Sequence, residues 1–312
     1  MLKDSLFYGK ILLFGEYGII QDSMGLSIPF NAYKGSLKKA SLTEDNKESN
    51  EHLRAFYNYL HKLQSEQVLL FDIDLEAFNI DLEEGMTFDS SIPQGFGVGS
   101  SGALVAAIYA QYGVNNKVIG DQPNSKDIAA LKAIFGQMEA YFHGKSSGLD
   151  PLICYLNLPI LIKSKASMGT VGLPENDAEG KGAIFLINSG IPGKTEPMVN
   201  IFMEKMKQEG FRNMLKKEFK KYNDACIQSF LKRDIKPLFS NLKELSSLLL
   251  QNFKPMIPSV FHKLWKEGID SNAYYLKLCG SGGGGYFLGF TENLEEAQKR
   301  LKDYPLEVVF TF

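Results

Sequence analysis

The order of apolar and polar positions in the first part of the chain predicts strands and turns, then helices. Up to about residue 43, short β-type runs such as FYGKILLFGEYGII alternate with glycine and proline. Residues 48–63 show a helical pattern, and two strand-like runs follow, VLLFDIDL and MTFDSSI. A second long helix is expected at about 125–142, after a glycine-rich loop and the apolar helical run ALVAAIYA. This part of the chain therefore mixes strands and helices.

The rest of the chain has a different pattern. AIFLINSG predicts a strand, and residues 197–251 hold long helical segments rich in Lys, Phe, Leu and Met. A strand is expected near 273–279 and another at the closing EVVFTF. The polar, turn-rich segment 173–181 separates the two patterns. We therefore expect two domains, residues 1–175 and residues 176–312.

Composition limits the class of protein. With 312 residues, 44% hydrophobic and 22% charged, the chain has the make-up of a globular protein. The formal net charge of -2, without a basic cluster beside aromatic residues, argues against a nucleic-acid partner. Lys10 and Glu16 interrupt the N-terminal apolar stretch, so we expect neither a signal peptide nor a membrane partner. Three well-separated cysteines, Cys154, Cys226 and Cys279, indicate a reducing compartment, and we expect the cytoplasm.

The segment PQGFGVGSSGA is the most informative run for function. Glycines alternate at Gly95, Gly97 and Gly99, and two hydroxyls follow at Ser100 and Ser101. A glycine loop that opens directly into a helix offers free N–H groups and the positive end of the helix dipole to an anion. The run therefore predicts a phosphate-binding loop. A glycine-rich turn before an ordinary helix is the alternative.

Charged residues outside the loop have a functional and a structural interpretation. Lys10 lies in an apolar strand, where an unpaired cation would be costly, so we expect a carboxylate or phosphate partner; a lysine that extends to solvent is the alternative. Glu139 is either a metal ligand or an ordinary helix-face carboxylate, and Asp150 either a cleft carboxylate or a turn residue. His143, before a glycine, is interpreted as the end of a helix and is left out of the catalytic set.

Three motifs together resemble the signature motifs of the GHMP kinases, which include galactokinase, homoserine kinase, mevalonate kinase and phosphomevalonate kinase. They are GKILLFGEY, the glycine loop and KLCGSGGGG, in the order of the family. The segment EAYFHGKSSGLD, from Glu139 to Asp150, is similar to the mevalonate kinase segment between the magnesium glutamate and the catalytic aspartate. The resemblance implies an α+β fold: an N-terminal domain like ribosomal protein S5 domain 2 and a ferredoxin-like C-terminal domain with added helices.

The resemblance also implies roles for individual residues, with ATP and Mg²⁺ as cofactors. Asp150 would act on the substrate hydroxyl, with Lys10 holding it ionised, and Ser101 and Glu139 would bind the metal. The residues expected to bind the nucleotide are Ser90, Gly95, Phe96, Gly97, Val98, Gly99, Ser100, Ser101, Gly282 and Gly283. Those expected to bind the substrate are Glu16, Tyr17 and Thr195.

The run NSGIPGKT also resembles a Walker A loop. That pattern requires glycine where Asn188 stands, and no strand ending in a magnesium aspartate accompanies it. The run is instead similar to the mevalonate kinase stretch that ends in Pro-x-x-Thr and lines the acceptor site. On this interpretation Thr195 bonds the substrate.

The expected function is phosphorylation of a small molecule with a free hydroxyl, with mevalonate favoured and isoprenoid biosynthesis as the pathway. Three departures leave the acceptor open. Tyr17 stands where mevalonate kinases usually have His, Cys279 replaces the usual Thr, and the run SSGA is closer to phosphomevalonate kinases. Phosphomevalonate is the second candidate, a sugar or sugar phosphate the third, and a non-catalytic metabolite sensor the alternative of another class. Whether the chain forms a homodimer is left open.

Overall fold

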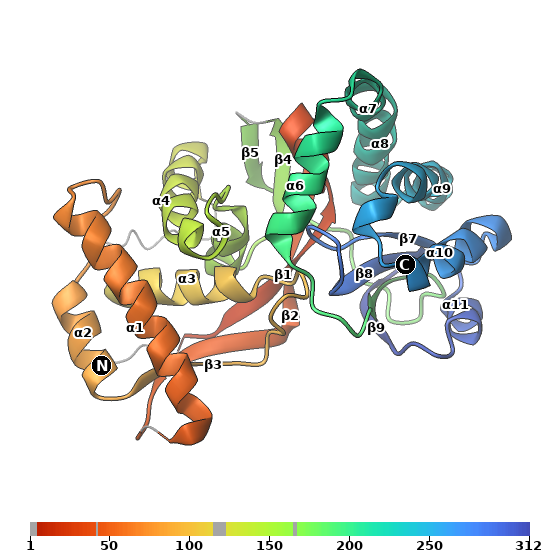
Figure 1. The fold of residues 1–312 in the computed structure, drawn as a ribbon. Helices are drawn as coiled ribbons and strands as arrows, with labels where there is room; N and C mark the ends of the chain where they lie inside the picture. The colour runs from red at the N-terminus through yellow and green to blue at the C-terminus, as the bar shows by residue number, and fades with distance from the viewer. Residues whose placement is uncertain (1–4, 42, 115–122, 165–166) are drawn as a thin grey trace. The chain divides into compact units, whose positions relative to one another are not determined.

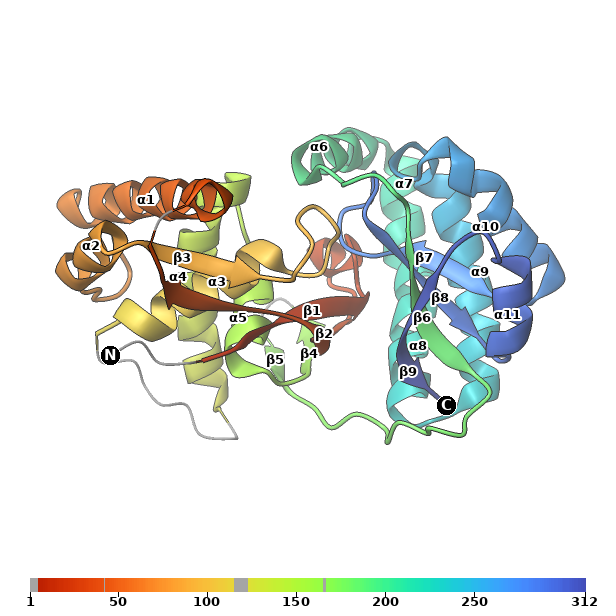
Figure 2. The same ribbon diagram turned by 90° about the horizontal axis from the view of Figure 1, so that it is seen from below.

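The computed structural model describes residues 5–41, 43–114, 123–164 and 167–312 as a mixture of helices and strands (Figures 1 and 2). The strands are β1 (Phe7–Phe14), β2 (Gly25–Lys39), β3 (Met86–Ser90), β4 (Ile160–Ser164), β5 (Ser167–Thr170), β6 (Ala183–Asn188), β7 (Tyr275–Leu278), β8 (Tyr286–Thr291) and β9 (Leu306–Thr311). The helices are α1 (Glu44–Ser65), α2 (Leu75–Glu83), α3 (Ser100–Tyr112), α4 (Ser125–His143), α5 (Leu149–Leu156), α6 (Thr195–Met206), α7 (Glu209–Met214), α8 (Lys220–Leu231), α9 (Ile235–Asn252), α10 (Ser259–Ser271) and α11 (Leu294–Arg300). The α+β fold class is confirmed.

The chain forms two compact units, each assembled from several segments. The first contains Met1–Lys10, Pro29–Pro93 and Gly99–Leu158, and the second contains Ile11–Ile28, Gln94–Val98 and Pro159–Phe312. The strands of one sheet have the order β1-β2-β4-β5, with β3 paired to β2. The expected division into residues 1–175 and 176–312 remains a prediction. The second compact unit includes two short segments from the N-terminal part of the chain, Ile11–Ile28 and Gln94–Val98.

The first unit is built around the apolar helix α3. Its run ALVAAIYA consists of apolar side chains and one tyrosine, and most of them are buried. Helices α4 and α5 pack against it (Figure 1), and α1 packs against β3. The expected helices at 48–63 and 125–142 are confirmed as α1 and α4.

The expected strand VLLFDIDL is wrong. This segment forms a single bridge, between Ile73 and Gly113, and its last residue begins helix α2. The carboxylate of Asp74 accepts a hydrogen bond from the N–H of Ala77 at 2.9 Å and caps that helix. An aspartate beside an apolar residue is therefore a helix start here rather than the polar face of a strand.

The second unit contains a four-stranded sheet in the order β7-β8-β6-β9, in which neighbouring strands pair antiparallel. All residues of β6 except the last are buried, and α9 and α10 pack against β7 (Figure 2). Gly289 lies opposite Phe185, where a Cβ would come within 2.2 Å of the phenylalanine ring. A four-stranded antiparallel sheet with helices against it agrees with the ferredoxin-like expectation.

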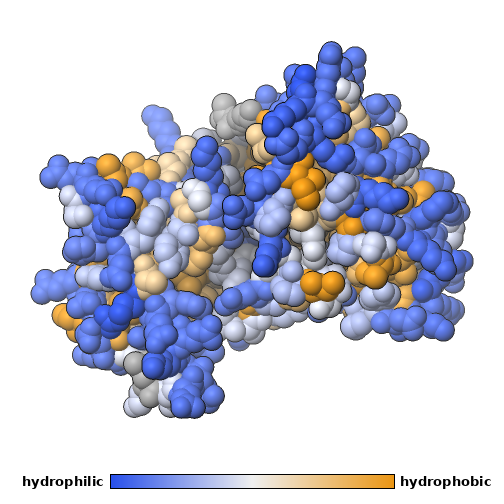
Figure 3. Space-filling model, viewed as in Figure 1, coloured by the Kyte–Doolittle hydropathy of each residue, from blue (hydrophilic) through white to orange (hydrophobic). Residues whose placement is uncertain are grey.

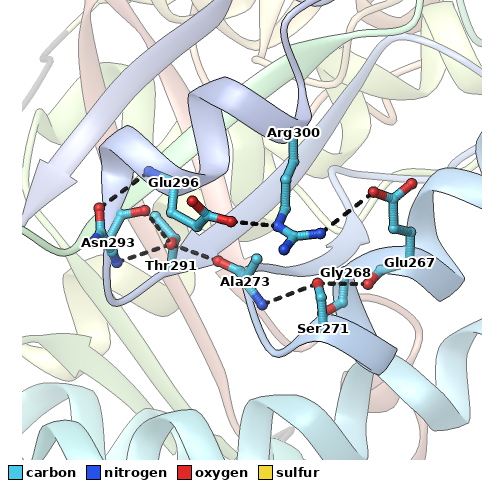
Figure 4. Close-up of polar contacts among 8 residues, drawn as sticks. All are labelled: Glu267, Gly268, Ser271, Ala273, Thr291, Asn293, Glu296 and Arg300. Atoms are coloured by element: carbon cyan, nitrogen blue, oxygen red, sulfur yellow. Dashed lines mark hydrogen bonds and ion pairs between the residues drawn. The ribbon is translucent and has the colours of Figure 1, made fainter.

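A polar network connects the end of β8, helix α11 and helix α10 in this second unit (Figure 4). The fully buried Thr291 hydroxyl lies 2.7 Å from the carbonyl oxygen of Ala273 and accepts a hydrogen bond from the N–H of Asn293. Asn293 caps α11, and Arg300 at the other end of that helix bonds Glu296 at 2.7 Å and pairs with Glu267 of α10 at 3.7 Å. These contacts fix α11 to the end of β8 and to α10.

Surface hydrophobic residues are scattered on the face shown in Figure 3, where hydrophilic residues cover most of the area. Isolated exposed apolar residues are normal on monomeric proteins. Among the helices in the described residues, none combines the length and apolar character that a membrane span requires.

Candidate functional site

Both residues expected to be catalytic lie together in the first unit. The Nζ atom of Lys10 in β1 lies 2.7 Å from Oδ2 of Asp150, in the first turn of α5. The lysine side chain is 3% exposed, whereas that of Asp150 is 39% exposed. A buried ammonium requires a partner of opposite charge, and Asp150 provides it. The carboxylate thus has one oxygen held by Lys10 while the group remains accessible.

The start of α3 packs directly on this pair. Gly99 is the N-cap residue, with φ at 88°, and a Cβ on it would lie 2.9 Å from Cγ of Lys10. A Cβ on Gly102 would similarly lie 2.9 Å from the carbonyl carbon of Asp150. Ser100 and Ser101 form the first turn between these two glycines. The free N–H groups of the α3 N-terminus are therefore brought to the Lys10–Asp150 pair.

Glu139, on α4, forms the second part of this cluster. It is 3% exposed, and its two carboxylate oxygens accept hydrogen bonds from different hydroxyls, Oε1 from Ser101 at 3.1 Å and Oε2 from Ser146. Burial, aided by the nearby negative charge of Asp150, raises the pKa of Glu139 to about 7. A nearby cation would stabilise the ionised form of this buried carboxylate.

His143 contacts the same hydroxyl although it was left out of the expected catalytic set. Its Nε2 atom lies 3.2 Å from Oγ of Ser101. Burial lowers the pKa of His143, which favours the neutral imidazole. His143 is also the last residue of α4 and is followed by Gly144 at φ 70°, so the predicted helix end is confirmed.

The other half of the glycine loop belongs to the second unit, where backbone approaches backbone. Gly95 accepts a hydrogen bond from the N–H of Gly193 at 2.7 Å, and Phe96 accepts one from Tyr286 at 3.3 Å. A Cβ on Gly97 would lie 2.4 Å from the carbonyl oxygen of Cys279. The close contact with Cys279 therefore requires glycine at position 97, whether or not the loop also binds phosphate. Val98, the last loop residue in this unit, is fully buried.

Two of the three expected substrate residues converge on one serine. The hydroxyl of Tyr17 donates to the carbonyl oxygen of Ser281 at 2.8 Å, and the Ser281 hydroxyl lies 3.5 Å from Oγ1 of Thr195. The Tyr17 ring stacks on Phe202 of α6 with ring centroids 4.5 Å apart. Ser281 was missed as a site residue, although it stands inside the motif KLCGSGGGG.

The third expected substrate residue, Glu16, is bonded to a different partner. It is 6% exposed, and its carboxylate pairs with the ammonium of Lys277, which also donates to the carbonyl oxygen of Leu278 at 3.0 Å. Both side chains of the pair are nearly inaccessible. This contact gives Glu16 a structural task that the sequence did not indicate.

The remaining expected nucleotide residues have local contacts. The Ser90 hydroxyl, at the end of β3, accepts a hydrogen bond from the N–H of Ile92 at 3.1 Å. Gly282 and Gly283 have φ values of 81° and 78°, and the N–H of Gly283 donates to Met256 at 2.7 Å. Positive φ values at both positions explain why the run there is glycine.

Comparison with known proteins finds a family-model match over part of the chain. Residues 54–157 match the family model of the GHMP kinases N terminal domain. No curated protein matches the sequence.

Solved structures share the fold over the full length of the chain. Mevalonate kinase of L. major, in complex with R-mevalonate, gives a TM-score of 0.65 at 14% identity, over 100% of this chain and 99% of that one. Mevalonate kinase of Methanococcus jannaschii gives 0.61 at 18% identity, over 100% and 99%. Phosphomevalonate kinase of Streptococcus pneumoniae, in complex with phosphomevalonate and AMPPNP, gives 0.63 at 12% identity, over 99% and 98%.

The family model matches the segment that holds the Ser101 and Glu139 cluster and Asp150, and the solved kinases share the fold of the whole chain. Part of the chain, residues 54–157, thus matches a GHMP kinases N terminal domain, and the fold of the whole chain is like that of solved mevalonate kinases.

Proposed function

We propose that the chain is an ATP- and Mg²⁺-dependent kinase that phosphorylates the primary hydroxyl of mevalonate. The observation that carries the proposal is the Lys10–Asp150 ion pair at 2.7 Å, packed against the glycine-capped start of α3. It joins a carboxylate that can act on a hydroxyl to a helix N-terminus that can receive phosphate oxygens. A metabolite sensor would need the second of these features but not the first.

In this proposal Asp150 orients the acceptor hydroxyl and takes its proton as the oxygen attacks the γ-phosphorus. Lys10 holds one oxygen of this carboxylate and adds positive charge beside the reacting oxygen. The loop from Gly95 to Ser101 and the first turn of α3 supply N–H groups for the phosphates. Phosphoryl transfer depends mainly on such positioning and charge stabilisation.

The donors at Glu139 fit Mg²⁺. This ion is usually held by one or two carboxylates together with phosphate oxygens and water, rather than by a cage of protein ligands. The described residues accordingly contain no group of three His, Cys, Asp or Glu side chains that could enclose a metal. Glu139 and the Ser101 hydroxyl would hold the ion, and its charge would offset the negative charge of the phosphates. The buried position of Glu139, which raises its pKa, supports this assignment, because a bound cation would stabilise the charged form of the carboxylate.

We assign the acceptor to the surroundings of Tyr17 and Thr195, whose hydroxyls meet at Ser281. Mevalonate carries a carboxylate and a tertiary hydroxyl that need such hydrogen-bonding partners. Glu16 is assigned a supporting role through Lys277. Phosphomevalonate remains the second candidate, because kinases for both acceptors share this fold. The three cysteines are all buried. The cytoplasm remains our proposed location.

The test is ADP release by the purified protein with a panel of acceptors: mevalonate, phosphomevalonate, homoserine, galactose and sugar phosphates. We expect kcat/KM for mevalonate to exceed that for phosphomevalonate at least tenfold, or roughly 1.4 kcal/mol. A higher value for phosphomevalonate would reverse the ranking of the two kinases. Absence of acceptor-dependent ADP release with every compound would contradict the kinase proposal.

A further inference from the structure

The hydroxyl of Ser146 connects the carboxylate of Glu139 to the turn that leads to Asp150. Its Oγ atom donates to Oε2 of Glu139 and accepts a hydrogen bond from the N–H of Gly148 at 3.0 Å. An ionised carboxylate can only accept and an N–H can only donate, so the directions of both bonds are fixed. Ser146 therefore links α4 to the start of α5, the helix that carries Asp150 in its first turn.

The backbone of this turn is held independently of the serine side chain. A Cβ on Gly148 would lie 2.0 Å from the carbonyl oxygen of Lys132, and one on Gly136 would lie 3.2 Å from that of Ser146. Gly136 belongs to α4, one turn before Glu139. The turn thus rests closely on α4 through backbone contacts. Removal of the Ser146 hydroxyl should leave its path unchanged.

One hydrogen bond is not enough to orient a buried glutamate. The terminal torsion of a Glu side chain is broad, so a carboxylate held at one oxygen can still rotate. Ser101 holds Oε1, but in the proposed function its own oxygen also faces the metal. Ser146 holds the other oxygen from a different element and has no such second task.

We propose that Ser146 is a positioning residue for the metal: it fixes the orientation of the Glu139 carboxylate and couples it to the turn that carries Asp150. The proposal rests on the kinase function proposed above. Outer partners of metal ligands commonly change metal affinity or activity by about 10- to 100-fold when they are removed. The contribution of Ser146 should lie at the lower end, because Ser101 retains one oxygen.

The chain provides a matched control in the next residue. The hydroxyl of Ser147 accepts a hydrogen bond from the N–H of Leu149 at 3.3 Å, just as that of Ser146 does from Gly148. Ser147→Ala therefore removes a similar hydrogen bond from the backbone N–H two residues after the serine, but it does not remove a donor to Glu139. Ser146→Thr retains the hydroxyl and tests rescue.

The experiment measures Mn²⁺ affinity by electron paramagnetic resonance in the presence of AMPPNP. Ser146→Ala should weaken Mn²⁺ binding by about tenfold. Ser147→Ala should stay close to wild type, and Ser146→Thr should restore the wild-type affinity because it keeps the hydroxyl that bonds Glu139.

Equal Mn²⁺ affinity in Ser146→Ala and in the wild-type protein would overturn the positioning role. An equal loss in Ser147→Ala would also overturn it, because the effect would then come from the turn. If Ser146→Ala does not fold, Ser146→Cys, with a weaker donor of similar size, should show the same changes at smaller amplitude. An inactive wild-type protein would contradict the proposed function, whereas the Mn²⁺ comparison would still decide the role of Ser146.

Discussion

Oδ2 of Asp150 lies 2.7 Å from the ammonium of Lys10, and the two residues differ strongly in exposure, 39% against 3% for their side chains. The ion pair is therefore one-sided: Lys10 is enclosed by β1 and the start of α3, while the carboxylate remains open to an incoming group. The ion pair thus holds one oxygen of Asp150 in place.

The first prediction concerns Lys10. Lys10→Met should lower kcat by at least about 100-fold, because the ammonium that positions Asp150 and, in the proposed function, faces the reacting oxygen is lost. Steady-state kinetics with the accepted substrate measures the change. Lys38→Met is the control: Lys38 pairs with Asp89 in the same unit, but both side chains are largely exposed, so activity should be unchanged. Similar kcat values for Lys10→Met and wild type would exclude Lys10 from catalysis.

The second prediction concerns Glu139 and pH. Burial raises the pKa of Glu139 from 4.5 to about 7, so the folded protein binds its proton at pH values where the unfolded chain has released it. The free energy of unfolding of the metal-free protein should therefore fall as pH rises through this window. Glu139→Gln removes the titration, and at pH 8 the variant should be more stable than wild type by about 3 kcal/mol.

Thermal or urea unfolding at pH 5 and pH 8 measures this difference, and the gap should narrow at the lower pH. The same variant should need more Mg²⁺ for half-maximal rate, because a neutral amide is a poor ligand for the ion. Glu51→Gln, at an exposed position on α1, is the control for loss of a carboxylate. A Mg²⁺ titration like that of wild type would return Glu139 to a purely structural role.

The third prediction concerns Gly97. Gly97→Ala should destabilise the fold as well as weaken ATP binding, because φ is 80° and the new Cβ would meet the Cys279 carbonyl oxygen at 2.4 Å. Gly144→Ala separates the positive φ from the steric clash, because Gly144 has a φ of 70° but nothing lies within 4 Å of the added carbon. We expect a loss of about 1–3 kcal/mol for backbone strain and a larger one for Gly97→Ala. Unfolding curves and ATP titrations of both variants measure these effects. An equal loss in the free energy of unfolding for Gly97→Ala and Gly144→Ala would contradict this explanation.

The fourth prediction concerns Thr195. Thr195→Val keeps the shape of the side chain but removes the hydroxyl, so KM for the acceptor should rise while KM for ATP stays near its wild-type value. A site built to bond a hydroxyl loses affinity sharply when the partner group is missing. Ser247→Ala is the control, because the Ser247 hydroxyl bonds only the carbonyl oxygen of Lys243 in its own helix α9. A rise in KM for ATP alone would place Thr195 on the nucleotide side.

Much of the first unit could be predicted from the sequence because its signals are local. The glycine loop, the apolar run of α3 and the helix that ends at His143 are each visible within about twenty residues. Asp150 was interpreted as a cleft carboxylate, with a turn residue before proline as the alternative, and it lies in the first turn of α5. Pro151 is compatible with that position, because its missing N–H would have had no partner in the first helical turn.

The remaining site contacts could not be predicted, because they join residues far apart in the chain. Glu16 was expected to face the substrate, but its buried partner Lys277 belongs to a strand near the other end of the sequence. Two adjacent serines, Ser146 and Ser147, look alike in sequence, yet only Ser146 donates to Glu139. The tight contact at Gly97 similarly depends on a strand end that the loop itself does not identify.

The most direct test of the account is the turnover of Asp150→Asn. We expect kcat to fall by about 10²- to 10⁴-fold, because the positioned base is lost, while the affinity for ATP stays close to wild type. The melting temperature should fall, because the buried Lys10 ammonium loses its ion pair with Asp150. Asp89→Asn, at an exposed ion pair, should behave as wild type. An Asp150→Asn enzyme that retained more than about a tenth of the wild-type kcat would contradict the catalytic role of Asp150.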